Sequence, residues 1–154
     1  MNFSSPQDPF SCSANLRAVA QKMFNQMRLN ACVRQAWSLI GGRRSMPSLA
    51  ERIAGRGISA QHSLGLRAVE IRHIVGTESR ADDFDPLFNP RADRMRERWV
   101  RIAELRLRQA GLPAIDLIQV GGEYFVRDGH HRVSVARILG NAYIDANVTV
   151  IELG

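Results

Sequence analysis

The stretch that decides the fold is EYFVRDGHHRVSVARIL, residues 123–139. Its first residues carry the aromatic and β-branched side chains typical of a strand, and Asp128-Gly129 follows them as a turn. From residue 130 onward, apolar side chains recur at the spacing of a helix that packs on a sheet and stops at Gly140. The stretch therefore predicts a strand that turns directly into a helix.

The residues on both sides extend this unit into a layered domain. Gly121-Gly122 separates two strand-like runs and indicates a β-hairpin. The elements expected in chain order are a strand over 68–74, a helix over 92–110, strands over 115–120 and 123–127, a helix over 130–139 and a strand over 143–153. This order predicts an α+β domain with a small mixed sheet and packed helices.

The N-terminal third predicts a helical extension to that domain. From Leu16 to Ala31, apolar residues recur at the spacing of one helix face, and this helix should end before Gly41. Residues 41–66 contain several glycines and are expected to form a loop, with a short helix at 48–54. We therefore expect a helical extension and loop over 1–66 and the domain over 67–154.

The turn at residues 128–132 has the chemistry of a phosphate site. The first turn of a helix has free backbone N–H groups and a partial positive charge, and Gly129 lets an anion approach the backbone. His130, His131 and Arg132 add side-chain donors at the same place. Asp128 would repel phosphate, so it is expected to cap the helix, to hold Mg²⁺ carried by phosphates, or to accept a proton from a substrate.

A structural interpretation of the same residues stays open. In this interpretation Asp128 is only a helix cap, His130 and His131 are exposed, and Arg132 pairs with an acidic residue at the surface.

The same residues carry a resemblance to a known family. Residues 122–137, GEYFVRDGHHRVSVAR, resemble the core of the ParB/sulfiredoxin-like superfamily, in which a strand leads through a basic turn with a leading glycine into a helix. Residues 69–80, VEIRHIVGTESR, together with Phe84, resemble the first conserved box of that superfamily. The two boxes stand in the expected order with a helix between them, and the resemblance covers residues 68–152.

The resemblance implies a nucleotide ligand. In that superfamily the turn binds nucleotide phosphates: partition proteins use CTP, sulfiredoxins use ATP, and a related serine kinase uses ADP. Hydrolysis or phosphoryl transfer, with ATP, ADP or CTP and Mg²⁺, is therefore a hypothesis for this chain. Sulfiredoxins need a cysteine directly after the glycine of the turn, where this chain has His130, so sulfinic acid reduction is not expected. By motif, the resemblance implies these roles: phosphate binding by Gly129, His130, His131, Arg132 and Arg80, and a catalytic base at Glu78, with Asp128 as the other candidate base.

The charge of the chain supports a second hypothesis. The net charge is +6, and Lys22 is the single lysine, so nearly all of the positive charge is on arginines. A positive charge favours anionic partners but does not indicate which kind of anion is bound. This second hypothesis is a nucleic-acid-binding accessory module, called the nucleic-acid hypothesis below. It would contact nucleic acid through arginines in and beside the helix expected over 92–110: Arg91, Arg94, Arg98, Arg101 and Arg108. The alternative is a solvated face in which Glu97 pairs with Arg101 and Glu104 pairs with Arg108. A third hypothesis is a non-catalytic interaction domain with an empty pocket.

The remaining expectations concern location and assembly. The chain has no secretion signal, no apolar run of membrane-spanning length and two cysteines expected to be reduced, so we expect a cytoplasmic protein with no membrane partner. The face of the first helix with Met23, Phe24 and Met27 must be buried, either on its own domain or against a second copy, and we expect a homodimer.

Two further features concern single side chains and one loop. Trp37 and Trp99 both stand at apolar helical positions and are expected in the core. The acidic loop with Asp82, Asp83 and Asp85 is expected to be solvated, with the alternative that it folds over the basic turn as a lid.

Overall fold

The computed structural model describes residues 9–41 and 45–154. In chain order the elements are α1 (Pro9–Ser38), α2 (Leu49–Ile53), β1 (Ile58–Glu70), β2 (Ile74–Thr77), α3 (Arg96–Leu107), β3 (Ile115–Val120), β4 (Glu123–Asp128), α4 (His130–Ile138) and β5 (Tyr143–Leu153). Two 3₁₀ turns, η1 (Ile71–His73) and η2 (Asp93–Met95), precede β2 and α3. Within these residues, none of the helices has the length and apolar character needed to cross a bilayer.

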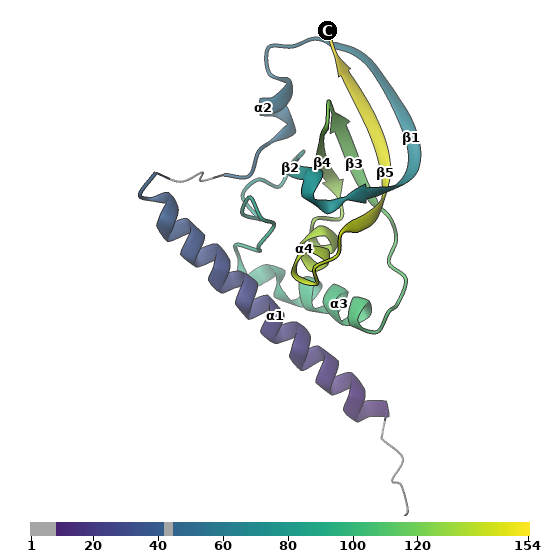
Figure 1. Ribbon diagram of the computed structural model, residues 1–154. Helices are drawn as coiled ribbons and strands as arrows, with labels where there is room; N and C mark the ends of the chain where they lie inside the picture. Colours follow the sequence, from purple (N-terminus) through teal and green to yellow (C-terminus); the bar gives the residue numbers. More distant parts are fainter. Residues whose placement is uncertain (1–8, 42–44) are drawn as a thin grey trace, which may run out of the picture.

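The five strands form one mixed sheet in the order β1-β5-β3-β4-β2 (Figure 1). The pairs β1–β5 and β3–β4 are antiparallel, whereas β3–β5 and β2–β4 are parallel. The mixed α+β class with an N-terminal helix is therefore confirmed. The order places the end of β4 beside the end of β2, so the turn after β4 lies next to the loop that follows β2.

Both faces of the sheet are covered at its centre, because alternate residues of a strand point to opposite faces. On β3, Ile115 and Leu117 belong to the main core, whereas Ile118 and Val120 belong to a smaller cluster. The main core also takes in side chains of α1, α3 and α4, and the smaller cluster includes Leu49 of α2. The helices that carry the candidate site thus lie on the main-core face of the sheet.

The long helix α1 is fixed to the domain through α3, which it crosses in Figure 1. The rings of Phe24 and Trp99 meet edge-on with centroids 5.6 Å apart, and Trp99 Nε1 donates to Ser134 Oγ on α4 at 2.8 Å. Ion pairs between α1 and the rest of the domain surround this contact: Arg17–Glu97, Arg28–Asp93 and Arg34–Asp85. The apolar face around Phe24 is therefore buried within the same chain, and the homodimer stays a prediction.

The expectation of a loop over 41–66 was wrong for residues 58–66. These residues form the start of β1 and pair with β5, with an irregularity between Ser63 and Gly65. Residues 58–68 are exposed, so β1 lacks the alternation of apolar side chains by which a half-buried strand is recognised. The strand expected over 68–74 is in fact the end of β1, the turn η1 and the start of β2. The domain boundary expected between residues 66 and 67 falls inside β1.

One of the two expected core tryptophans is at the surface. Trp99 is fully buried, but Trp37 is 67% exposed. Trp37 stands near the end of α1, about three turns beyond Met27, where the helix packs on the main core. The adjacent Ser38 is buried, so this end of α1 is covered on one side and the Trp37 side chain lies on another side.

Candidate functional site

The candidate site is the junction between β4 and α4. Gly129 is the N-cap of α4 and has φ +101° and ψ 20°, a left-handed conformation that favours glycine. No side chain caps the helix, so the N–H groups of its first turn are not satisfied in that way. Asp128 is therefore not the cap. The predicted strand-to-helix turn is confirmed, with an uncapped helix N-terminus at its centre.

The Arg132 guanidinium is hydrogen-bonded to other groups of this chain. Nη1 donates to the backbone oxygens of Pro113 and Ala114 at 2.6 and 2.8 Å, and Nη2 donates to Asp128 Oδ2 at 2.6 Å. The side chain is 14% exposed. Arg132 thus ties the α3–β3 loop to the start of α4, as the structural interpretation expected for its pairing with an acid.

We expect Arg132→Ala to destabilise the fold by about 2–3 kcal/mol, because two backbone oxygens and a carboxylate lose a charged donor. Urea unfolding followed by circular dichroism measures this change. Lys22→Ala on α1, an exposed cation, should change stability far less. A variant as stable as the wild type would show that the loop does not depend on Arg132.

His130 is buried and held by Thr77 at the end of β2. The two lone pairs of Thr77 Oγ1 accept from the N–H groups of Ser79 and Arg80 at 3.2 and 3.1 Å. The Thr77 hydroxyl is therefore left to donate, and His130 Nε2 lies 2.6 Å from it, closer than the Val126 oxygen at 3.4 Å. It follows that Nε2 is the acceptor and that the ring proton of His130 is on Nδ1.

His131 is buried beside the same turn, with one polar atom left without a partner. Its Nδ1 is buried and has no hydrogen-bond partner in the described residues. Phe84, from the acidic loop, packs against both histidine rings, at centroid distances of 5.8 Å for His130 and 5.4 Å for His131. The interpretation in which both histidines are exposed was wrong.

Both histidines are held neutral. Burial lowers the pKa of His130 to about 4, and the nearby Arg80 guanidinium acts in the same direction. Burial also lowers the pKa of His131 to about 4, with further contributions from Arg98 and Arg80. At neutral pH the histidines therefore bring no positive charge to the turn, and the charge comes from arginines.

A small cavity of about 20 Å³ lies at the N-terminus of α4. This volume admits one water or one phosphate oxygen, so the rest of a phosphate group would lie at the mouth. Its lining joins the turn to two arginines from other elements: Arg80, Arg98, Ile102, Asp128, Gly129, His130, His131 and Arg132. Arg80 therefore lies at the turn, as the resemblance implied. Arg98 lies there too, although the sequence analysis had assigned it only to the nucleic-acid hypothesis.

The acidic loop partly covers this site. Arg80 Nη1 lies 3.2 Å from Asp83 Oδ2, and Asp83 also pairs with Arg94. Asp85 is buried, and its carboxylate accepts from the backbone N–H groups of residues 87 and 89. Phe84 of this loop packs on the two histidine rings, so the loop contacts the turn. This is the arrangement expected in the alternative in which the loop acts as a lid.

Glu78, one of the two candidate bases, lies apart from the cavity. Glu78 pairs with Arg127, with Arg127 Nε 3.1 Å from Glu78 Oε2, and Glu78 is not among the residues that line the cavity. Asp128 lines it, although one of its oxygens is bonded to Arg132. Of the two carboxylates, the structure brings Asp128 and not Glu78 to the turn.

The arginines of the nucleic-acid hypothesis have different surroundings. Two of them precede α3, and one of these, Arg94, pairs with Asp83. Arg108 pairs with Glu104 at 2.6 Å, as the solvated-face alternative expected, but Glu97 pairs with Arg17 of α1. Arg101 is exposed and has no ion pair among residues 9–41 and 45–154. Arg91 is half-buried and lies beside Asp85 in another small cavity.

The described residues do not form a ready metal centre. Within them, no group of three or more His, Cys, Asp or Glu side chains is placed to hold a metal ion. Asp128 is the one carboxylate among the residues that line the cavity at the turn.

Comparison of this chain with models of protein families, with curated proteins and with solved structures found no match.

Proposed function

We propose that this protein binds a phosphate group of a nucleotide or of another phosphorylated ligand at the N-terminus of α4. One phosphate oxygen would enter the small cavity and accept from backbone N–H groups of the first helical turn. The Arg80 and Arg98 guanidiniums would bind the remaining oxygens at the mouth. Arg132 would act indirectly, by holding the turn in shape.

The observation that carries this proposal is the position of Arg98. It is an exposed arginine that lines the cavity at an uncapped helix N-terminus, and no carboxylate in the described residues lies within ion-pair distance of it. The unpartnered Nδ1 of His131 at the same cavity supports a polar ligand there. An unpaired cation beside free backbone donors is the arrangement that anions bind in proteins.

The resemblance to the ParB/sulfiredoxin-like superfamily extends the proposal to ATP, ADP or CTP with Mg²⁺, and we keep the cytoplasm as the expected location. Turnover is a further part of the proposal. If phosphoryl transfer or hydrolysis occurs, Asp128 is the better candidate base, because it lines the cavity and Glu78 does not.

Arg98→Gln is expected to weaken phosphate binding at least tenfold, because one charge-assisted contact contributes about 1.5–3 kcal/mol. Calorimetric titration with ATP, ADP, CTP, GTP and inorganic phosphate, each with Mg²⁺, measures the affinity and identifies the ligand. The variant should keep the stability of the wild type, because Arg98 makes no ion pair in the described part of the chain.

Arg101→Gln is the matched control, since it removes an exposed arginine one turn along the same helix that does not line the cavity. Equal losses in Arg98→Gln and Arg101→Gln, with steep salt dependence on DNA or RNA, would favour the nucleic-acid hypothesis. No binding of any of these ligands by the wild type would overturn the proposal and favour an interaction domain.

A further inference from the structure

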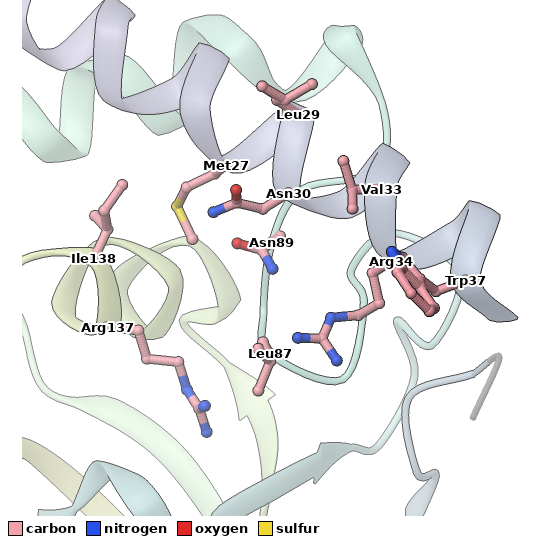
Figure 2. Close-up of a pocket in the computed structure, with 10 residues that line it drawn as sticks. All are labelled: Met27, Leu29, Asn30, Val33, Arg34, Trp37, Leu87, Asn89, Arg137 and Ile138. Atoms are coloured by element: carbon pink, nitrogen blue, oxygen red, sulfur yellow. The ribbon is translucent and has the colours of Figure 1, made fainter. Parts of the chain in front are cut away.

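A second and much larger cavity lies at the other end of α4. It has a volume of about 680 Å³ and lies between the second half of α1, the loop around residues 87–89 and the end of α4 (Figure 2). This volume is within the range of about 300–1,000 Å³ that is usual for ligand sites. No residue lines both this cavity and the one at the α4 N-terminus, so the two sites are separate and the inference does not rest on the proposed phosphate site.

The walls of the large cavity are mostly apolar and open to water. Trp37 is 67% exposed and Leu29 is 58% exposed, although both stand on a helix whose opposite face is buried. The apolar lining residues are Met27, Leu29, Val33, Trp37, Leu87 and Ile138. A ligand with an apolar body would remove this surface from water.

The polar lining residues include two arginines and no acid: Asn30, Arg34, Asn89 and Arg137. Figure 2 shows Arg34 extending from α1 and Arg137 from α4 on either side of Leu87. Arg34 Nε lies 3.4 Å from Asp85 Oδ2, so its charge is largely balanced. Arg137 makes no ion pair within residues 9–41 and 45–154, although the nearby Asp85 carboxylate also attracts its charge.

Arg137 is held in place but is not saturated. Its Nη2 donates to the backbone oxygens of Ile71 and Ile74 at 3.2 and 2.7 Å, and its guanidinium lies over the Phe88 ring. In the described residues, neither Nε nor Nη1 has a hydrogen-bond partner. Burial lowers the pKa of Arg137, against the opposing attraction of the Asp85 carboxylate. Nε is itself buried, so Nη1 is the donor open to an anion, and a fixed, half-buried cation with a free donor at an apolar cavity is a site for an anion.

We infer that this cavity binds a small amphipathic carboxylic acid, with the apolar body against α1 and the carboxylate at Arg137. A single negative charge suits the site, because the two arginines Arg34 and Arg137 and the one carboxylate Asp85 together leave one net positive charge. A phosphate dianion would exceed that charge. A second copy of the chain, also with a net charge of +6, is a less suitable occupant.

Decanoate is the probe that tests this inference on the full chain. The fluorescence of Trp37, in the cavity wall, should change on binding, whereas Trp99 is fully buried. We expect saturable binding with one decanoate per chain. Decanol, which has the same apolar body without the charge, and decyl phosphate should each bind at least tenfold more weakly.

Val33→Glu and Val19→Glu form a matched pair of variants. Both replace a partly exposed valine of α1, but only Val33 lines the cavity. A carboxylate at position 33 should weaken decanoate binding at least tenfold by repulsion, and Val19→Glu should leave it unchanged. Arg137→Gln should reduce decanoate affinity to that of decanol. If this variant does not fold, the comparison of Val33→Glu with Val19→Glu still tests the inference.

Several results would overturn the inference. These are equal affinities for decanoate and decanol, equal affinities in the two glutamate variants, or no binding of decanoate at all. Binding of an acidic amphipathic peptide without binding of decanoate would assign the cavity to a protein partner. Dimerisation that Val33→Glu abolishes in sedimentation would assign it to a second copy.

Discussion

Gly129→Ala is expected to destabilise the protein by about 3–5 kcal/mol, from a strained backbone and an overpacked core together. The residue has φ +101°, which L side chains rarely adopt. An added Cβ would clash with Ile115 Cγ2 and would lie 2.8 Å from Ile115 Cβ, closer than Cβ atoms approach other atoms in real structures. Ile115 is fully buried in a central strand, so it cannot move away. Either β4 or α4 must therefore shift, and the site shifts with it.

Gly140→Ala, at the other end of α4, separates the effect of backbone strain from the effect of core overpacking. Gly140 also has a positive φ, +70°, but an added Cβ there meets nothing within 4 Å. This control should cost about 1 kcal/mol, the backbone contribution alone. Urea unfolding of both variants measures the difference. Equal losses in the two variants would show that the contact with Ile115 is not a constraint on the turn.

Acid should destabilise the protein by up to about 3 kcal/mol for each buried histidine between pH 6.5 and pH 4. Histidine in the unfolded chain has a pKa near 6.5. In the folded protein, burial lowers the pKa of His130 and of His131 to about 4. Between these values the unfolded chain binds more protons than the folded one, so the free energy of unfolding falls as the pH falls. Above pH 6.5 both states are neutral at these positions, and the effect is absent.

The hydrogen bond of His130 adds to burial in making its protonation unfavourable. A proton on Nε2 would meet the Thr77 hydroxyl hydrogen, because both lone pairs of Thr77 Oγ1 already accept from the Ser79 and Arg80 amides. Unfolding free energies at pH 7, 6, 5 and 4.5 measure the slope, and His130→Gln and His131→Gln should each reduce it by about half. An unchanged slope in both variants would show that other groups cause the acid sensitivity.

The local structure of the candidate site could be predicted from sequence. A β-branched run, a glycine and a helical period are all properties of neighbouring residues, so the junction of β4, Gly129 and α4 was found at its correct place. The hairpin at Gly121-Gly122 was found for the same reason.

The role of each side chain in the site could not be predicted in this way. The pairing of Arg132 with an acid was one of the two sequence interpretations, but its bonds to the backbone oxygens of Pro113 and Ala114 join segments that are distant in sequence and were not predicted. Arg98 and Arg101 are both exposed arginines of one helix, and only the packing of α3 against α4 places Arg98 at the cavity.

The sequence by itself determined the elements whose signals are local: the helices α1, α3 and α4, the hairpin of β3 and β4, and the turn at Gly129. The tertiary structure alone decided which strand pairs with β5, which of two tryptophans is buried, and which charges stay without a partner. Backbone preference and periodicity act over a few residues and are visible along the chain. Burial and pairing depend on which distant segments meet, and here β1 meets β5, α1 meets α3, and Arg137 reaches a cavity whose other wall comes from α1.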